Sequence, residues 1–320
     1  MYNNINPKYK SFLFFLIKLT IVFGSLYFIY DKVVQNESIK FSEFISQIKN
    51  VLLQKKGTIP ILLFLSFLNW FFEILKWEAL ANIIQKTSFY DATKQSLAAL
   101  TVSLFTPNRI GDYGAKAVYF SKNKSKIILL NLIGNLNQLL ATILFGITGI
   151  YYFITTYNIE INPYRVQKIA YLLGFLLLLF IPNKSRKVKF FSFLQIDKLK
   201  YFVKTIAIKT HLKITLFSLI RYLIFSHQFY FLLIVFGVKV DYATLMYLIF
   251  TMYFLASFIP SISLFDWAVK GFVAIYIFTF IGISELTIIT ITLLMWILNF
   301  AIPSLIGCLF VMNFKISKGL

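Results

Sequence analysis

The chain has 320 residues, of which 59% are hydrophobic and only 14% are charged, and its formal net charge is +20. Soluble domains carry about 25% charged residues, so this composition excludes a water-soluble fold. The basic residues lie in short segments beside apolar runs, which predicts membrane lipids rather than nucleic acid as the partner. One cysteine, Cys308, and two histidines predict no disulfide, no metal site and no cofactor.

The N-terminal region begins with an apolar run over residues 12–30 that follows Lys8 and Lys10, as in a signal peptide. The run is long for a signal peptide, and it lacks a small-x-small cleavage site. We therefore predict an uncleaved first span. Residues 31–56 mix acidic and basic side chains, a pattern typical of an amphipathic helix at the membrane surface.

Six apolar runs reach or exceed the roughly 17 to 25 residues that cross a bilayer, namely 12–30, 57–84, 126–154, 164–181, 212–236 and 286–312. Between the second and third runs a proline, Pro107, divides a further apolar stretch into two limbs, and Pro260 does the same between the fifth and sixth. Each divided stretch predicts a re-entrant helical hairpin. The expected fold is an all-α transmembrane bundle with six full spans and two hairpins, in a single domain over residues 1–320.

The charge pattern predicts how the spans are oriented. The loop from Pro182 to Leu212 holds eight Lys and Arg residues against Asp197 alone, which places it in the cytoplasm by the positive-inside rule. Counting outward from this loop places the lysines of residues 122–126 and both termini in the cytoplasm as well. We expect a multi-pass protein of the cell membrane.

If each hairpin returns to the side it entered, the first opens from the cytoplasm and the second from outside. Residues 57–154 and 212–312 then each contain a span, a broken hairpin and a span, which is the layout of inverted-repeat transporters. The halves share a loose skeleton of Pro, then Asp, then Lys four residues later, made of Pro107, Asp112 and Lys116 in one and Pro260, Asp266 and Lys270 in the other.

The first break combines helix-terminating and flexible residues. Pro107 ends the incoming limb, and Gly111 and Gly114 are expected to permit close backbone approach. Asp112 falls in the first turn of the outgoing limb, where a carboxylate suits the positive end of a helix.

Arg109 lies at this bend, and free helix N–H groups beside a guanidinium predict a phosphate site. A phospholipid headgroup or a polyprenyl phosphate is the expected ligand. In the alternative interpretation, Asp112 and Lys116 only neutralise each other across one helical turn, while Arg109 extends to the cytoplasmic surface.

The second break offers Ser261 and Ser263 as caps for its outgoing limb, followed by Asp266 and Lys270 one turn apart. The same two interpretations apply, because an internal ion pair also lets two charges remain within a membrane.

Polar residues on the spans follow helical spacing. Asn131, Asn135 and Gln138 form one stripe on the third span, as ligand contacts or as hydrogen bonds between helices. Glu73 with Lys76 on the second span is similar. Arg221 on the fifth span has no acidic neighbour within one turn, so its partner must come from another helix or from a ligand.

At the first break, Pro107, Arg109, Gly111 and Asp112 resemble the Pro-x-Arg-x-Gly-Glu/Asp signature of the lysylphosphatidylglycerol synthase transmembrane-region family, also called flippase-like domain proteins. Chain length, the number of hydrophobic segments and the second proline-broken stretch fit this family. The resemblance implies lipid translocation, as in the flippase half of the fused synthases. Their aminoacyl-transferring half is a soluble domain that this chain lacks, so we expect no lipid lysinylation.

Two classes of function therefore remain open. One is a flippase for an anionic phospholipid or a polyprenyl-phosphate-linked lipid, working by alternating access at the two breaks. Its expected binding residues are Arg109, Gly111, Asp112, Lys116, Arg221, Ser261, Asp266 and Lys270. The other is a membrane-embedded lipid-modifying enzyme such as a glycosyltransferase, or the non-catalytic partner subunit of one. Because no Asp-x-Asp motif is present, we expect no catalytic site.

Overall fold

The computed structural model describes residues 57–104, 106, 109–159, 196–259 and 266–314, together with Ser46 and Lys49, and these residues form helices and turns without a strand. Four helical spans are long and apolar enough to cross a membrane: α3 (Thr58–Ala81), α6 (Lys124–Thr156), α10 (Ile208–Val235) and the last span, Glu285–Met312. They confirm four of the six expected spans and support a membrane protein. The spans expected at 12–30 and 164–181, and the surface helix expected within 31–56, fall outside the described ranges.

Each proline-broken stretch consists of two shorter helices. The first pair is α4 (Phe89–Ser103) and α5 (Ile110–Val118), and the second is α11 (Tyr242–Ser257) and α12 (Asp266–Thr279). Side chains cap the first helix of each pair: Ser88 Oγ accepts from the Asp91 N–H at 3.1 Å, and Asp241 Oδ2 accepts from the Thr244 N–H at 2.8 Å. The breaks at Pro107 and Pro260 themselves are not among the described residues.

One expected loop contains a helix. Residues 182–212 were expected to form a loop, but α9 (Ile196–Thr205) lies within it and α10 already begins at Ile208. The segment is too polar and too short to span a membrane. A helix of ten residues that does not span needs neither an apolar composition nor that length.

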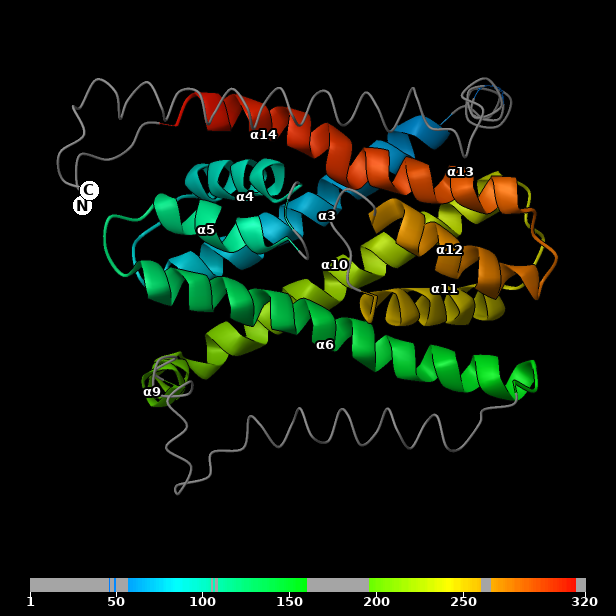
Figure 1. Cartoon of the computed structure of the whole chain (residues 1–320), viewed down its shortest axis with the longest axis horizontal. Helices are drawn as coiled ribbons and strands as arrows, with labels where there is room; N and C mark the ends of the chain where they lie inside the picture. The colour runs from blue at the N-terminus through cyan, green and yellow to red at the C-terminus, as the bar shows by residue number, and fades with distance from the viewer. Residues whose placement is uncertain are drawn as a thin grey trace.

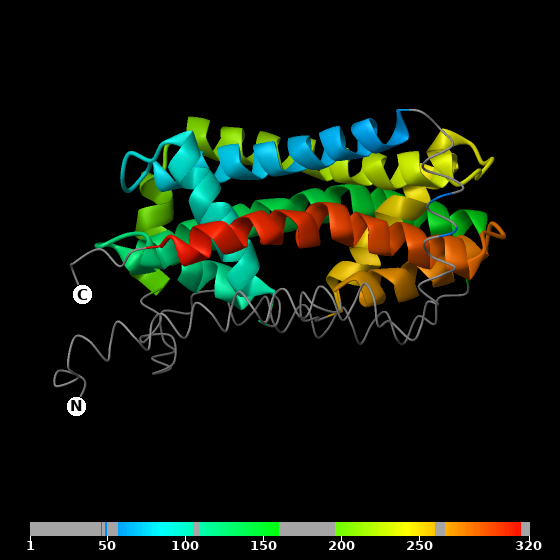
Figure 2. The same cartoon turned by 90° about the horizontal axis from the view of Figure 1, so that it is seen from above.

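The helices of the two halves correspond one to one, α3 with α10, α4 with α11, α5 with α12, and α6 with the last span. Exchanging the halves maps the main contacts between helices onto one another: α4 packs on α14 (Ile302–Met312) as α11 packs on α6, and the contact of α3 with α10 maps onto itself. Corresponding spans run in opposite directions along the long axis (Figure 1), and α3 and α10 share one side of the molecule (Figure 2). α4 and α11 each end near the middle of the molecule, approaching from opposite ends (Figure 1).

The segments that were predicted to be cytoplasmic lie together. The turn between α5 and α6, helix α9 and the end of α14 occupy one end of the molecule, and the turns after α10 and α12 occupy the other (Figure 1). We call the first the basic end, because Lys122, Lys124 and Lys126 belong to it. The described parts of the segments predicted to be cytoplasmic thus share one end of the molecule.

The last span is interrupted by a π-helical segment. It comprises α13 (Glu285–Trp296), the π-helix η2 (Ile297–Ala301) and α14. Pro303 has no N–H to donate to the carbonyl of Asn299, and that carbonyl instead accepts a hydrogen bond from Trp70 Nε1 at 3.0 Å. Farther along, a Cβ on Gly307 would collide with the Leu97 carbonyl, so this glycine allows α14 and α4 to pack closely.

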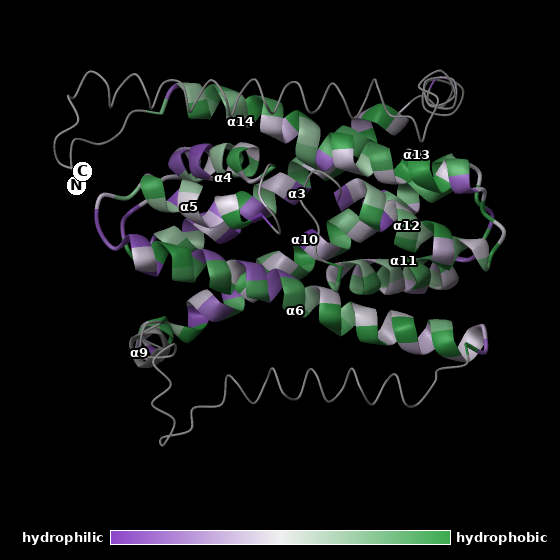
Figure 3. Cartoon of the chain, viewed as in Figure 1, coloured by the Kyte–Doolittle hydropathy of each residue, from purple (hydrophilic) through white to green (hydrophobic). Residues whose placement is uncertain are grey.

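The outer surface of the spans is apolar. Large exposed hydrophobic side chains lie along α3, α6 and α14, including Phe67, Ile147 and Leu309. Polar residues concentrate instead on α4, α5 and the adjoining half of α6 (Figure 3). A membrane-facing exterior and a polar region around the first break are therefore both present.

Candidate functional site

A buried cluster of charged side chains joins the two halves through Glu73 on α3. Its Oε2 atom lies 2.7 Å from Lys76 Nζ and 2.7 Å from Arg221 Nη1 on α10, and its Oε1 atom lies 4.0 Å from Lys116 Nζ on α5. The partner of Arg221 thus comes from another helix, one of the two possibilities that the sequence left open.

The Asp112 and Lys116 pair on α5 belongs to the same cluster. Lys116 Nζ lies 3.3 Å from Asp112 Oδ2 and donates to Asn131 Oδ1 at 2.9 Å, while Asn131 Nδ2 donates to Asp112 Oδ2 at 2.6 Å. The ammonium group also lies 4.5 Å from the ring centre of Trp77. Three helices therefore hold this pair.

The cluster is buried and carries an excess of positive charge. Lys76 and Lys116 are each 2% exposed, Asp112 is 5% exposed and Glu73 is 8% exposed. Lys76, Lys116 and Arg221 supply three cations, whereas Glu73 and Asp112 supply two anions. One positive charge therefore has no counterion within the cluster.

A chain of amides extends the cluster along the interface between the halves. Arg221 Nε donates to Asn69 Oδ1 at 3.1 Å, and Asn69 Nδ2 donates to Asn299 Oδ1 at 2.9 Å. Asn299 Nδ2 donates in turn to Gln228 Oε1 at 2.9 Å, and Gln228 Nε2 donates to Ser66 Oγ at 2.7 Å. The chain connects α3 and α10 to η2.

The polar stripe of α6 contacts protein along its length. Asn131 joins the cluster, Asn135 Nδ2 donates to Tyr113 Oη at 3.0 Å, and Gln138 Oε1 accepts from Arg221 Nη1 at 3.4 Å. These contacts favour hydrogen bonding between helices over a free ligand surface.

Arg109 lies at the start of α5 in a left-handed conformation, with φ 58° and ψ 31°. Such a backbone is uncommon for a residue with a side chain and often marks a functional site. Next to it, Gly111 N–H donates to Thr106 Oγ1 at 2.8 Å, and a Cβ on Gly111 would lie 3.0 Å from that side chain. The bend is therefore tight, as the sequence predicted for Gly111.

The side chain of Arg109 is only partly satisfied. Its guanidinium carbon lies 5.6 Å from the ring centre of Phe300 on η2, and its Nε is buried without a hydrogen-bond acceptor among the described residues. Arg109 also lies close enough to Arg221 for the two guanidinium groups to repel each other. It adds to the positive charge of the cluster.

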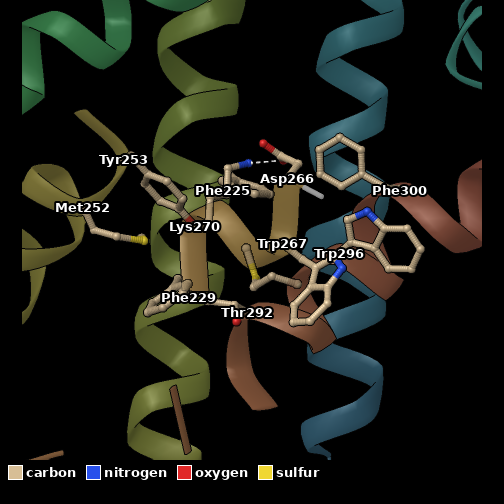
Figure 4. A pocket seen from close by; sticks show the side chains of 11 residues that line it. Phe225, Phe229, Met252, Tyr253, Asp266, Trp267, Lys270, Thr292, Trp296 and Phe300 are labelled. Atoms are coloured by element: carbon tan, nitrogen blue, oxygen red, sulfur yellow. Dashed lines mark hydrogen bonds and ion pairs between the residues drawn. The ribbon is translucent and has the colours of Figure 1, made fainter. Parts of the chain in front are cut away.

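At the second break, Lys270 Nζ lies 2.7 Å from Asp266 Oδ2 (Figure 4), as in the interpretation of an internal ion pair that the sequence left open beside a ligand site. Three aromatic rings surround the ammonium group, with ring centres at 5.5 Å for Phe225, 6.0 Å for Tyr253 and 5.4 Å for Phe300. The cavity between these side chains encloses about 10 Å³, room for about one water molecule.

A larger groove opens at the basic end, between the start of α4, the end of α5 and the end of α14. It has a volume of about 410 Å³ and is lined by Lys94, Gln95 and Tyr119, among others. Gln95 Oε1 accepts a hydrogen bond from Trp77 Nε1 at 2.7 Å, and the Trp77 ring contacts Lys116. Two side chains thus connect the groove to the charged cluster.

The structure brings some of the expected site residues together and leaves others apart. Arg221, Asp112 and Lys116 share the buried cluster, and Lys270 with Asp266 forms a separate pair. Ser261 and Ser263 lie outside the described residues. The prediction for Gly114 was wrong, because no described atom outside its own helix and chain neighbours lies within 4 Å of a Cβ built there.

Four contributors were missed as site residues. Glu73 and Lys76 were noted in the sequence only as polar residues on a span, although their spacing of three within an apolar run was a signal. Asn299 and its neighbour Phe300 were not singled out. The signal was Pro303, which has no N–H and therefore leaves the backbone carbonyl of residue 299 in need of another donor.

Within the described ranges, no group of three His, Cys, Asp or Glu residues could hold a metal ion. A scan against protein-family models and searches of curated proteins and solved structures found no match for this chain. Function must therefore be argued from the site itself.

Proposed function

We propose that this chain is a flippase-like translocase for an anionic phospholipid or a polyprenyl-phosphate-linked lipid. The observation that carries the proposal is the uncompensated positive charge at the interface of the halves. Three cations face two anions in the buried cluster, and no described residue forms an ion pair with Arg109. Unbalanced charge is costly inside a membrane protein, and a bound phosphate would supply the missing anion.

Guanidinium and ammonium groups suit this ligand. Arg109 presents a planar set of donors to phosphate oxygens, and its Nε has no described acceptor to give up when a ligand binds. Because Lys116 and Arg221 are already paired, they act in this proposal as the positive field around the site rather than as its first contacts.

The relation between the halves supports alternating access. Corresponding spans run in opposite directions (Figure 1), as in an inverted repeat, and α4–α5 and α11–α12 are then two re-entrant hairpins. The cluster contains Glu73 and Asp112 from one half and Arg221 from the other. Rocking of one half against the other would remake these contacts and expose the site to each leaflet in turn.

The groove at the basic end gives the headgroup an entry route in this mechanism. Its volume of about 410 Å³ falls in the range of small-molecule sites. Lys94 lies at its wall, 3.6 Å from Asp91, and the Gln95–Trp77 hydrogen bond leads from it toward Lys116. The exposed apolar surface of the spans accommodates the acyl or polyprenyl chains meanwhile.

The proposal is tested with purified protein in liposomes that contain one fluorescent lipid at a time: phosphatidylglycerol, a polyprenyl phosphate or phosphatidylcholine. Chemical bleaching of the outer leaflet reports the rate at which label crosses. We expect at least one anionic lipid to cross faster than phosphatidylcholine. Equal rates for all three lipids, or rates no greater than in protein-free liposomes, would contradict the proposal.

The same samples address the alternative functions. With a nucleotide-sugar donor added to these liposomes, chromatography of the recovered lipids detects a glycosylated product if the chain is a glycosyltransferase. Unaltered lipids together with no transport would favour a non-catalytic partner subunit instead.

A further inference from the structure

Among the described residues, Phe300 has the only aromatic ring that contacts cations from both breaks. Arg109, from the first half, lies 5.6 Å from its centre, and Lys270, from the second half, lies 5.4 Å from it. Both distances are within the range of cation–π attraction. The ring therefore sits where the positive groups of the two halves converge.

The backbone that carries Phe300 departs from α-helical geometry. η2 is a π-helical turn in a span that is otherwise α-helical, and such turns occur frequently at functional sites. Its neighbour Asn299 links the turn to α3 and α10 through Asn69 and Gln228. A shift of one half against the other would thus change the hydrogen bonds that hold this turn.

The space around the ring is too small for a headgroup while the ring is in place. The cavity beside Lys270 has room for about one water molecule, and Phe300 forms part of its wall (Figure 4). While the ring is in place, this cavity has no room for a phosphate beside Lys270.

We propose that Arg109 and Lys270 together form a phosphate site, and that the Phe300 ring fills this site until a phosphate-bearing lipid displaces it. Phosphate oxygens replace the ring as the partner of both cations, a stronger contact because it joins opposite charges. The inference rests on the proposed function, since it assigns the headgroup site of the same translocase. Asp266 holds Lys270 in position throughout.

Phe225 provides a matched control. Its ring centre lies 5.5 Å from Lys270 Nζ, close to the distance found for Phe300, and both side chains are partly buried. Only Phe300 also contacts Arg109 among the described cation–aromatic pairs. Removing either ring takes one aromatic contact from Lys270, but only removal of Phe300 vacates the proposed site.

The test is equilibrium binding of fluorescent phosphatidylglycerol to the purified full chain in detergent, with phosphatidylcholine as the comparison lipid. Loss of two cation–π contacts predicts that Phe300→Ala and Phe300→Leu lower the Kd for phosphatidylglycerol at least about fivefold. Phe225→Ala changes it less than twofold. The leucine variant keeps the apolar bulk, so it preserves the test if the alanine variant does not fold.

Arg109→Gln and Lys270→Met should each weaken this binding, and their combined effect should differ from the product of the single effects, because both residues hold one phosphate. Phe300 variants that bind like Phe225→Ala, or that gain equally for phosphatidylcholine, would overturn the inference. Binding needs no transport: tighter binding by Phe300→Leu with no lipid movement in liposomes would sink the proposed function alone. Transport without any effect of Phe300 would sink this inference alone.

Discussion

Replacement of Glu73 by glutamine tests whether the buried cluster is held by charge. The carboxylate touches Lys76 and Arg221 at 2.7 Å each and Lys116 at 4.0 Å. Glu73→Gln keeps the shape of the side chain but leaves Asp112 as the only anion facing three cations. Removing one partner of a buried ion pair costs about 3 to 5 kcal/mol, because the other charges remain buried without compensation.

The assay is thermal unfolding of the purified protein in detergent, followed by tryptophan fluorescence. Large domains lose about 2 to 4 °C of Tm per kcal/mol, so Glu73→Gln should lower Tm by roughly 6 to 20 °C. Glu78→Gln is the matched control, since Glu78 lies on the same helix and forms no ion pair among the described residues. We expect the control to change the stability by less than about 0.5 kcal/mol.

A second substitution separates charge from shape. Adding Lys76→Met to Glu73→Gln leaves Lys116 and Arg221 facing Asp112, which restores the original excess of one positive charge. The double variant should therefore be more stable than Glu73→Gln alone. A single variant as stable as the wild type, or a double variant no better than the single, would refute the electrostatic account.

Three further predictions concern topology, packing and the bend. Single cysteines at Ser121 and Ser284, in a chain without its native cysteine, should react with an impermeant thiol reagent from opposite sides of the membrane; labelling from one side contradicts the inverted halves. Gly307→Ala should destabilise the protein by about 1 to 3 kcal/mol through overpacking against α4, whereas Gly114→Ala, whose added Cβ meets no described atom outside its own helix and chain neighbours, should not lower Tm. Glycine adopts the left-handed backbone conformation of residue 109 without a steric penalty, so Arg109→Gly should have a Tm no lower than that of the wild type. The same variant should lose transport. A lower Tm would count against this account of the bend.

Periodicity and hydropathy predicted much of the scaffold because they are local properties. The spans α3, α6, α10 and Glu285–Met312 were expected to within a few residues, apart from the longer start of α10. The pairs Asp112–Lys116 and Asp266–Lys270 followed from one-turn spacing on a helix. Helix α9 was missed because a polar, basic stretch was assigned by its topological signal rather than by its length.

The composition of the site depended on packing between distant segments, which the sequence does not encode locally. Arg221 was expected to need a partner, but only the crossing of α3 and α10 identifies that partner as Glu73. Asn299 became visible once η2 placed its side chain between Asn69 and Gln228. Spacing rules apply within one helix, and these contacts lie between helices.

The measurement that tests the central claim most directly is the rate at which phosphatidylglycerol crosses liposomes containing wild-type protein or Arg109→Gln. Lys239 is an exposed cation in the turn after α10, at the end of the molecule opposite the basic end, and provides the control variant Lys239→Gln. The account predicts that Arg109→Gln slows the crossing at least about tenfold, since a hydrogen bond between charged groups contributes about 1.5 to 3 kcal/mol, and that Lys239→Gln leaves it unchanged. Equal rates for Arg109→Gln and the wild type would contradict the claim that this arginine binds the headgroup.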